Sequence, residues 1–279
     1  MTEPRHHAEK AARPALAIRD LTVEFARHGG VLRTVDQVSL DVWPSEIVGV
    51  IGESGSGKTM TALSAMRLLP YGAKVSGSIE LGGRNILGLS EAEMRALRGD
   101  RIALIPQDAM QALNPTLNVG RQVGEPYEFH RNFSFRAAAA KVIDLLRAVK
   151  IADPEMRARE YPHQFSGGMQ QRAMIATGLA LDPELIIADE PTTALDVTVQ
   201  ARILKLLREI RDERGSAILF ITHELGIVAE LCDWVYVMNG GKVVEDGPVK
   251  RIFQAPRADY TRMLLEATPS IHGRKGGRR

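Results

Sequence analysis

Residues 52–59, GESGSGKT, place glycines, a lysine and a threonine at the spacing of a phosphate-binding loop. Glycines let backbone N–H groups face phosphate oxygens, and the N-terminus of the following helix adds partial positive charge. We expect Lys58 to reach the β- and γ-phosphates and Thr59 to ligate Mg²⁺. Nucleotide binding is therefore predicted for the whole loop, made of Gly52, Glu53, Ser54, Gly55, Ser56, Gly57, Lys58 and Thr59.

Two adjacent carboxylates follow a second apolar run, in the string LIIADE. The four apolar residues predict a buried strand, and Asp189 at its end is expected to hold Mg²⁺ through water. Glu190 comes next and is the candidate general base or water-positioning residue. Neighbouring carboxylates can also simply end a strand, but a phosphate loop in the same chain favours the chemical interpretation.

Strand and helix patterns alternate around these motifs. The run EIVGVIG is continuously apolar and ends in glycine, as expected of a central parallel strand that feeds a tight turn. A helix is expected from Lys58 to Leu69, where Pro70 stops it. Further strands are expected at 77–83, 101–107, 184–189 and 217–222, a helix at 224–232, and a hairpin around Asn239-Gly240.

Two other regions have a different character. Residues 15–25 and 35–43 alternate apolar and polar side chains, as half-buried antiparallel strands do. From 108 to 180 the pattern becomes helical: 134–149 carries apolar residues three and four apart, and Ser166 is a good N-cap for another helix. A further helix is expected to bury Val199, Ile203, Leu206, Leu207 and Ile210.

These patterns together predict an α/β fold around a mostly parallel, doubly wound sheet. The fold would carry an antiparallel β subdomain and an inserted helical subdomain at about 108–180. We expect the folded domain to span 16–265, between a disordered N-terminal tail at 1–15 and a basic C-terminal tail at 266–279.

Composition excludes several classes of protein. Of the 279 residues, 44% are hydrophobic and 25% charged, as in ordinary globular proteins. A net charge of +2 gives no bulk basic field, so we expect no nucleic-acid partner. Apolar runs of about 18 residues and a signal-peptide pattern are both absent from the sequence. One cysteine, Cys232, cannot form a disulfide within the chain, which fits a reducing compartment.

The strings GESGSGKT, FSGGMQQR and LIIADEPTTALD together resemble the nucleotide-binding subunit of an ABC transporter over about residues 16–265. The resemblance implies a P-loop NTPase with a RecA-like core, which hydrolyses ATP with Mg²⁺ between two such subunits. It also implies that Ser166, Gly167 and Gly168 face a γ-phosphate held by the opposite subunit, with Gln170 beside them. Phe165 and Gln170 depart from the usual family residues, without removing a phosphate donor.

The resemblance assigns four further residues. Gln107 matches the glutamine that contacts Mg²⁺ and the attacking water, and His223 matches the histidine that senses the γ-phosphate. Asp196 matches an aspartate that crosses the dimer interface. Phe25 lies where the family stacks an aromatic ring on adenine, although packing within a strand remains an alternative for it.

Several strings are similar to the peptide and nickel importer branch of that family, namely MTALSAMRLLP, LSEAEMRALRG, ALNPTLNVGRQ and DYTRMLL. The last is a partial match, because Ala258 and Asp259 replace the branch's His and Pro. The resemblance implies an ATPase energising import, most simply of peptides. Nickel or another small solute, an exporter, and a carbon–phosphorus-lyase-type accessory ATPase remain alternatives, because the solute need never touch this chain.

The partners implied by the resemblance follow from the same branch. They are a second ABC ATPase subunit, in a homodimer or heterodimer, and two integral membrane permeases. A periplasmic or extracellular solute-binding protein would act indirectly. The expected location is peripheral, on the cytoplasmic face of the inner membrane.

Overall fold

The computed structural model describes residues 13–27, 30–193 and 195–267. Two compact units divide the chain: residues 1–85 and 220–279 form unit 1, and residues 86–219 form unit 2. Both units contain strands and helices, which confirms the predicted α/β class. Most of each expected tail lies outside the described residues. Ala15, however, is buried, and its carbonyl accepts the N–H of Gly82 at 2.9 Å, so the folded part begins before the predicted boundary.

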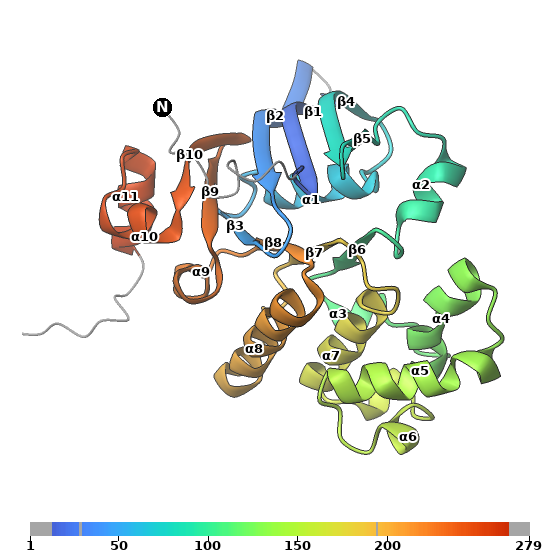
Figure 1. The fold of residues 1–279 in the computed structure, drawn as a ribbon. Coiled ribbons are helices and arrows are strands. Elements are labelled where there is room, and N and C mark those ends of the chain that lie inside the picture. The colour runs from blue at the N-terminus through green and yellow to red at the C-terminus, as the bar shows by residue number, and fades with distance from the viewer. Residues whose placement is uncertain (1–12, 28–29, 194, 268–279) are drawn as a thin grey trace, which may run out of the picture. The chain divides into compact units, whose positions relative to one another are not determined.

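An antiparallel sheet forms one part of unit 1, with the strand order β2-β1-β4-β5 (Figure 1). On β2 the alternating sequence produces alternating burial, with Val38, Leu40 and Val42 buried. The predicted antiparallel strands are therefore confirmed. The strands are β1 (Leu16–Arg27), β2 (Gly30–Val42), β4 (Ala73–Leu81) and β5 (Arg84–Asn85).

A second set of strands in unit 1 includes β3 (Ile47–Ile51), every residue of which is buried. β3 pairs in parallel with β9 (Trp234–Asn239), which pairs antiparallel with β10 (Lys242–Pro248). The predicted hairpin is present, but its turn is Gly240-Gly241, because both glycines adopt the positive φ angles, 54° and 82°, that this tight turn needs. β8 (Ala217–Ile221) enters unit 1 at its carboxyl end.

Helix α1 (Lys58–Met66) follows β3 and is shorter than predicted. It ends before Leu69 because Arg67 adopts a left-handed conformation with φ of 49°, and the N–H of Arg67 then bonds the carbonyl of Ser64 at 3.0 Å. The remaining helices of unit 1 are α9 (Leu225–Leu231), α10 (Val249–Gln254) and α11 (Asp259–Ala267).

Unit 2 contains the parallel pair β6 (Ile102–Ile105) and β7 (Leu185–Asp189), with a run of helices between them in the chain. In this run α4, α5 and α7 pack against one another (Figure 1), which confirms that the predicted insertion is helical. Ser134 caps α5 and Ser166 caps α7, as predicted. The helices are α3 (Ala109–Ala112), α4 (Val119–Arg131), α5 (Phe135–Ala148), α6 (Pro154–Arg157), the 3₁₀ helix η2 (Pro162–Gln164) and α7 (Gly167–Gly178).

Two more helices complete unit 2. In α8 (Val197–Arg214) the buried face includes Ile203, Leu206, Leu207 and Ile210, while Val199 is only half-buried. Helix α2 (Glu91–Leu97) was not expected from the sequence. It begins with a capping box, in which the N–H of Glu93 donates to the Ser90 hydroxyl and the N–H of Ser90 donates to the Glu93 carboxylate. The Ser-x-x-Glu spacing was the signal that would have revealed it.

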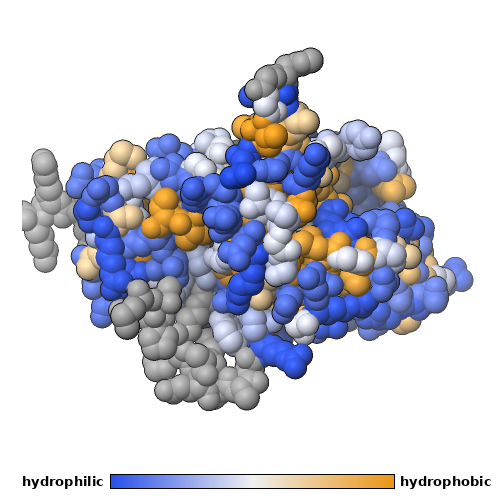
Figure 2. All heavy atoms as spheres, turned by 90° about the horizontal axis from the view of Figure 1, so that it is seen from above, coloured by the Kyte–Doolittle hydropathy of each residue, from blue (hydrophilic) through white to orange (hydrophobic). Residues whose placement is uncertain are grey.

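The surface is mixed in character. Figure 2 shows hydrophobic residues interspersed with hydrophilic ones on the face that it displays. Among the described residues, none of the helices has the length and apolar character needed to cross a membrane.

Candidate functional site

The predicted phosphate loop lies in unit 1, between buried strand β3 and helix α1. The helix begins at Lys58, and its N-cap is Gly57, which supplies no side-chain hydrogen bond. The N-terminus of α1 therefore has no capping side chain between the loop and any anion that approaches it. This arrangement suits a phosphate group, since helix N-termini favour negative charge.

Two glycines of the loop are packed too closely for any side chain. A Cβ on Gly52 would lie 2.1 Å from the carbonyl oxygen of Met238, and one on Gly57 would lie 2.6 Å from that of Thr34. Gly57 also has a φ of 100°, which L side chains rarely adopt. The loop is thus held against the backbones of β9 and β2, and its path depends on glycine at both positions.

Lys58 lies within its own loop. Its side chain is buried, with 5% exposure, and Nζ donates to the carbonyl oxygens of Gly52 at 2.8 Å and Glu53 at 2.9 Å. The ammonium group is therefore positioned at the loop by two carbonyls. Phosphate oxygens are acceptors of the same kind with greater negative charge, so the geometry fits the predicted contact of Lys58 with phosphate.

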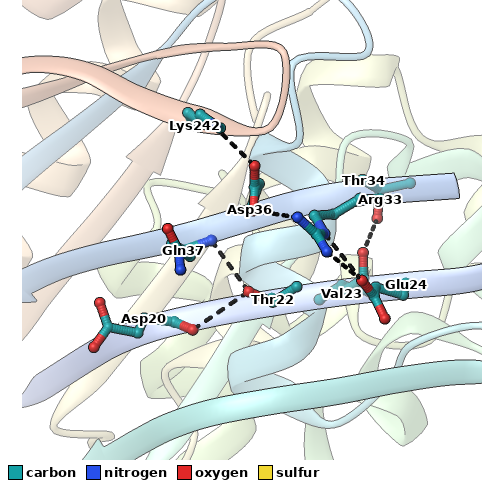
Figure 3. A network of polar contacts seen from close by, with 9 residues as sticks. All are labelled: Asp20, Thr22, Val23, Glu24, Arg33, Thr34, Asp36, Gln37 and Lys242. Carbon is teal, nitrogen blue, oxygen red and sulfur yellow. Dashed lines mark hydrogen bonds and ion pairs between the residues drawn. The ribbon is translucent and has the colours of Figure 1, made fainter. Parts of the chain in front are cut away.

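A polar network supports the strand that packs against Gly57 (Figure 3). On β2, Arg33 pairs with Glu24 of β1 at 2.9 Å, and Asp36 pairs with Lys242 of β10 at 3.1 Å. The N–H of Asp36 also donates to the carbonyl of Gly241 at 2.8 Å. The hydrogen bond from Lys242 lowers the pKa of Asp36, so the carboxylate is charged at neutral pH. This network ties β2 to the hairpin.

His223 lies near the end of β8 that belongs to unit 1. The N–H of Thr222 donates to the carbonyl of Val50 at 3.2 Å, and Val50 is on the strand that leads into the phosphate loop. The side chain of His223 is exposed. His223 therefore lies just after the carboxyl end of β8, close to β3, the strand that leads into the phosphate loop. Residues at the carboxyl edge of a sheet are expected to lie close together in this way.

Phe25 is a half-exposed residue on β1, in register with Leu32 of β2 and Ala73 of β4. Because its side chain is neither fully buried nor fully exposed, both interpretations of it stay open. Adenine stacking on Phe25 remains a prediction.

The predicted catalytic carboxylate lies in unit 2. Asp189 is the last residue of β7 and is buried, while Glu190 follows it with a φ of 47°. A left-handed backbone is uncommon for glutamate and often marks functional sites. The carboxylate of Glu190 accepts hydrogen bonds from the Gln107 amide at 3.3 Å and the Thr193 hydroxyl at 3.0 Å.

The structure thus brings Gln107 and Glu190 together. Their action on one water remains a prediction. Thr193 was not predicted as a site residue. Its position three residues after Glu190, in the string EPTT, was the available signal, because a hydroxyl at that spacing can turn back to the carboxylate.

Helix α7 begins within the string FSGGMQQR, the signature string, and α7 is the signature helix. Ser166 and Gly167 are exposed, whereas Gly168 is buried and a Cβ there would lie 2.5 Å from a methyl group of Val199. The close packing of Gly168 against α8 explains why this position needs glycine. The exposed hydroxyl of Ser166 accepts the N–H of Met169 at 3.4 Å, leaving lone-pair and donor capacity at the helix N-terminus.

Two predicted nucleotide-contacting residues already have structural roles. Gln170 is buried, and its amide donates to the carbonyls of Pro162 at 2.8 Å and Phe165 at 3.4 Å, which fixes the turn before α7. Asp196 caps α8, accepting the N–H of Val199 at 2.9 Å, and remains exposed. Contacts of either residue with nucleotide or a partner remain predictions.

A pocket of about 560 Å³ lies in unit 2. Several residues described above line it. They include Gln107, which follows β6, and residues in the first turn of α7. The lining residues are Gln107, Asp108, Ala109, Gln111, Gly167, Gln170, Gln171, Thr193 and Leu195.

Comparison with known proteins identifies the family in which the phosphate loop of unit 1 and the residues around Glu190 and α7 in unit 2 occur together. The family model described as "ABC transporter" matches residues 35–193, which is more than half of the chain. The chain belongs to the ABC transporter family. The match includes the phosphate loop, the start of α7 and Glu190. The chain has the strings GESGSGKT, FSGGMQQR and LIIADEPTTALD, and as a member of this family it is an ABC-type ATPase.

Relatives of this ABC protein are similar along most of its length. A probable peptide ABC transporter ATP-binding protein of Sinorhizobium fredii is 50% identical over 256 residues, covering 91% of this chain and 76% of the relative. The dipeptide transport ATP-binding protein DppD of Bacillus subtilis is 47% identical over 258 residues, covering 92% and 77%.

Solved structures confirm the fold expected for an ABC ATPase. A dimeric ATP-binding cassette, MJ0796, in a post-hydrolysis state bound to ADP and Pi, is similar with a TM-score of 0.75 and 25% identity. The similarity covers 84% of this chain and 98% of that one. The predicted P-loop NTPase fold is therefore confirmed.

Proposed function

We propose that this chain energises a peptide importer by binding and hydrolysing ATP, as one of two ATPase subunits attached to two membrane permeases. The names of its relatives support peptides as the solute, because two of them at 47% and 50% identity are named as peptide or dipeptide transport ATPases. A peripheral position on the cytoplasmic face of the membrane follows from that assembly.

The observation that carries the proposal is that one chain has both a phosphate loop with a buried lysine and a helix, α7, whose first residues are exposed. The loop supplies backbone N–H groups and the buried ammonium of Lys58 for the phosphates. Ser166 and Gly167, at the start of α7, are exposed and able to meet an anion held by another subunit. Asp196, exposed at the start of α8, is the proposed contact with that subunit.

Mg²⁺ fits the donor set of the chain. Among the described residues, no three His, Cys, Asp or Glu side chains form a group that could hold a metal by themselves. A protein that binds Mg²⁺ together with nucleotide phosphates needs only one or two ligands of its own. We propose Thr59 and Asp189 for that role, with Gln107 as a further contact. The ion, when bound, neutralises charge that develops on the phosphates.

The hydrolytic step requires a positioned water. Glu190 is the proposed base, and its hydrogen bonds from Gln107 and Thr193 orient the carboxylate. Glu190 would take a proton from water as the water oxygen attacks the γ-phosphorus. The bond from that phosphorus to the β–γ bridging oxygen would break, and ADP and phosphate would leave. His223, exposed beside the strand that leads to the phosphate loop, is the proposed sensor of the γ-phosphate.

Three measurements test this proposal: uptake of peptide, uptake of nickel, and co-purification with a membrane subunit. Vesicles containing the assembled complex should accumulate a labelled peptide with ATP and the solute-binding protein present, and a Glu190→Gln complex should not. The same wild-type vesicles should leave labelled nickel outside. Nickel uptake without peptide uptake would overturn the peptide assignment, and failure of the chain to co-purify with any membrane subunit would overturn the transport assignment.

A further inference from the structure

The chain after the β9–β10 hairpin has no part in the proposed chemistry, yet it contacts the phosphate loop. Helices α10 and α11 both belong to unit 1, as does the loop. Tyr260, in the string DYTRMLL, lies on α11. Its hydroxyl accepts a hydrogen bond from the backbone N–H of Glu53 at 3.2 Å, across 207 positions of sequence.

Both backbone polar groups of Glu53 are hydrogen-bonded. Its N–H donates to Tyr260, and its carbonyl accepts from Nζ of Lys58 at 2.9 Å. The residue that helps to position the phosphate-binding lysine is therefore itself fixed by α11. The side chain of Tyr260 is half-buried, so its ring is supported by packing as well as by this hydrogen bond.

A buried carboxylate fixes α11 to the hairpin. Glu245, on β10, accepts the N–H groups of Arg257 at 2.9 Å and Ala258 at 3.0 Å, which immediately precede α11. Arg251 of α10 pairs with the same carboxylate at 2.9 Å, where Glu245 is 5% exposed. Burial opposes ionisation, but these donors together hold the pKa of Glu245 below its ordinary value.

The carboxylate of Glu245 thus determines where α11 begins, and the start of α11 determines where Tyr260 lies. Tyr260 is the second residue of the helix, only two positions after Ala258. A short rigid connection therefore runs from β10 to the phosphate loop. The segment is attached at one end by a buried charge and contacts the loop through one hydroxyl.

We propose that α11 is a brace for the phosphate loop and that Tyr260 is a positioning residue for ATP binding. The inference rests on the proposed binding of ATP phosphates by the loop. Tyr260 itself touches no phosphate; it acts by holding the Glu53 peptide, and through it Lys58, in the binding conformation. Loss of the hydroxyl weakens ATP binding while leaving the hydrolytic residues of unit 2 untouched.

The test is Tyr260→Phe in the full chain, which removes the hydroxyl and keeps the ring. One hydrogen bond corresponds to about a 2- to 10-fold increase in the ATP dissociation constant, measured by equilibrium titration. In the assembled complex the KM for ATP should rise by a similar factor at unchanged kcat, and Tm should fall by no more than the loss of one hydrogen bond explains. The matched control is Tyr71→Phe, also in unit 1, because Tyr71 is fully exposed.

Two further variants separate the possible outcomes. Lys58→Ala should bind ATP far more weakly; if it binds normally, the proposed function of the loop fails. If Lys58→Ala loses ATP while Tyr260→Phe binds like wild type, the loop assignment stands and the brace is overturned. A fall in kcat at unchanged KM would also overturn it.

Glu245→Gln tests the anchor of the brace. It should weaken ATP binding as Tyr260→Phe does, and the double variant should be no weaker than the worse single variant, because both act through one contact. Additive losses would contradict the connection from Glu245 to Tyr260. The role of Tyr260 itself is decided by Tyr260→Phe, because that variant keeps the anchor intact.

Discussion

The phosphate loop of unit 1 and the signature helix of unit 2 are both predicted to meet phosphate, but they differ in how complete they are. The loop packs against two backbones, buries Lys58 and satisfies its ammonium group internally. At the start of α7, Ser166 and Gly167 are exposed, and so is Asp196 at the start of α8. One region is therefore preorganised within its unit, whereas the other presents polar groups outward.

Glu190→Gln is expected to have the strongest effect. It keeps the size of the side chain and removes the base, so kcat should fall by about 10²- to 10⁴-fold while ATP still binds. Steady-state phosphate release and equilibrium ATP titration measure the two quantities. Glu213→Gln, an exposed position in the same unit, is the control. Wild-type turnover in Glu190→Gln would remove Glu190 from the mechanism.

Lys58→Ala should come next and act on the other region. Charge-assisted hydrogen bonds contribute about 1.5–3 kcal/mol, so ATP affinity should fall by roughly 10- to 150-fold. The loss should appear in the dissociation constant itself, measured by titration. Lys74→Ala, on strand β4 of the same unit, serves as the control for loss of a positive charge. Equal effects of both variants would mean that bulk charge, not the loop, attracts the nucleotide.

Glycine substitutions distinguish the two regions. Gly57→Ala meets a backbone oxygen and a strained φ, which costs about 1–3 kcal/mol, and should impair ATP binding. In Gly168→Ala the new Cβ would lie 2.5 Å from the side chain of Val199, which must shift at the start of α7 in unit 2, so ATP binding by the loop should be spared and turnover reduced. Titration and phosphate release measure the two effects. Gly88→Ala, where a Cβ has open space, should change neither.

Asp196→Asn separates a capping role from a role of the charge. Asparagine caps helices about as well as aspartate, so the free energy of unfolding should stay within about 0.5 kcal/mol of wild type. If the carboxylate acts across the dimer, turnover should still fall. Asp196→Ala should lose both, with about 1 kcal/mol of stability removed along with the cap. Full activity of Asp196→Asn would leave the cap as the only role.

The weakest effect is expected in the network beside the loop. The pKa of Asp36 is lowered in the folded chain, so its contribution to stability is present above the unfolded pKa of about 3.9. That contribution is lost as pH falls through the lower, folded pKa. Asp36→Asn should therefore flatten the pH dependence of Tm below about pH 4. An identical pH profile in the variant would contradict a stabilising role of the Asp36 carboxylate and its pairing with Lys242 and Arg33.

Local signals made much of the structure predictable. The phosphate loop, the cap at Ser166 and the alternation of β2 depend on residues close together in sequence, and each is present as predicted. The predicted end of α1 at Leu69 was wrong, because Arg67 adopts a left-handed conformation and ends the helix at Met66, before Pro70 is reached. No rule about a run of apolar residues anticipates that conformation.

The contacts that the sequence could not reveal are those between distant residues. Tyr260 and Glu53 are 207 positions apart, and no local pattern links a C-terminal helix to a phosphate loop. Likewise, the capping role of Asp196 and the burial of Gln170 depend on how helices pack around them. The residue types at these positions fit several roles, and geometry was needed to show the contacts that they make.

The proposed function requires that the chain holds one complete phosphate loop and one signature helix that another subunit must meet. The ATPase rate per chain, measured against chain concentration with mass photometry in parallel, tests this requirement directly. We predict little turnover by monomers and a rise in rate per chain as dimers form, either alone or with a second ATPase subunit. A high rate per chain, constant under conditions where only monomers are present, would contradict it.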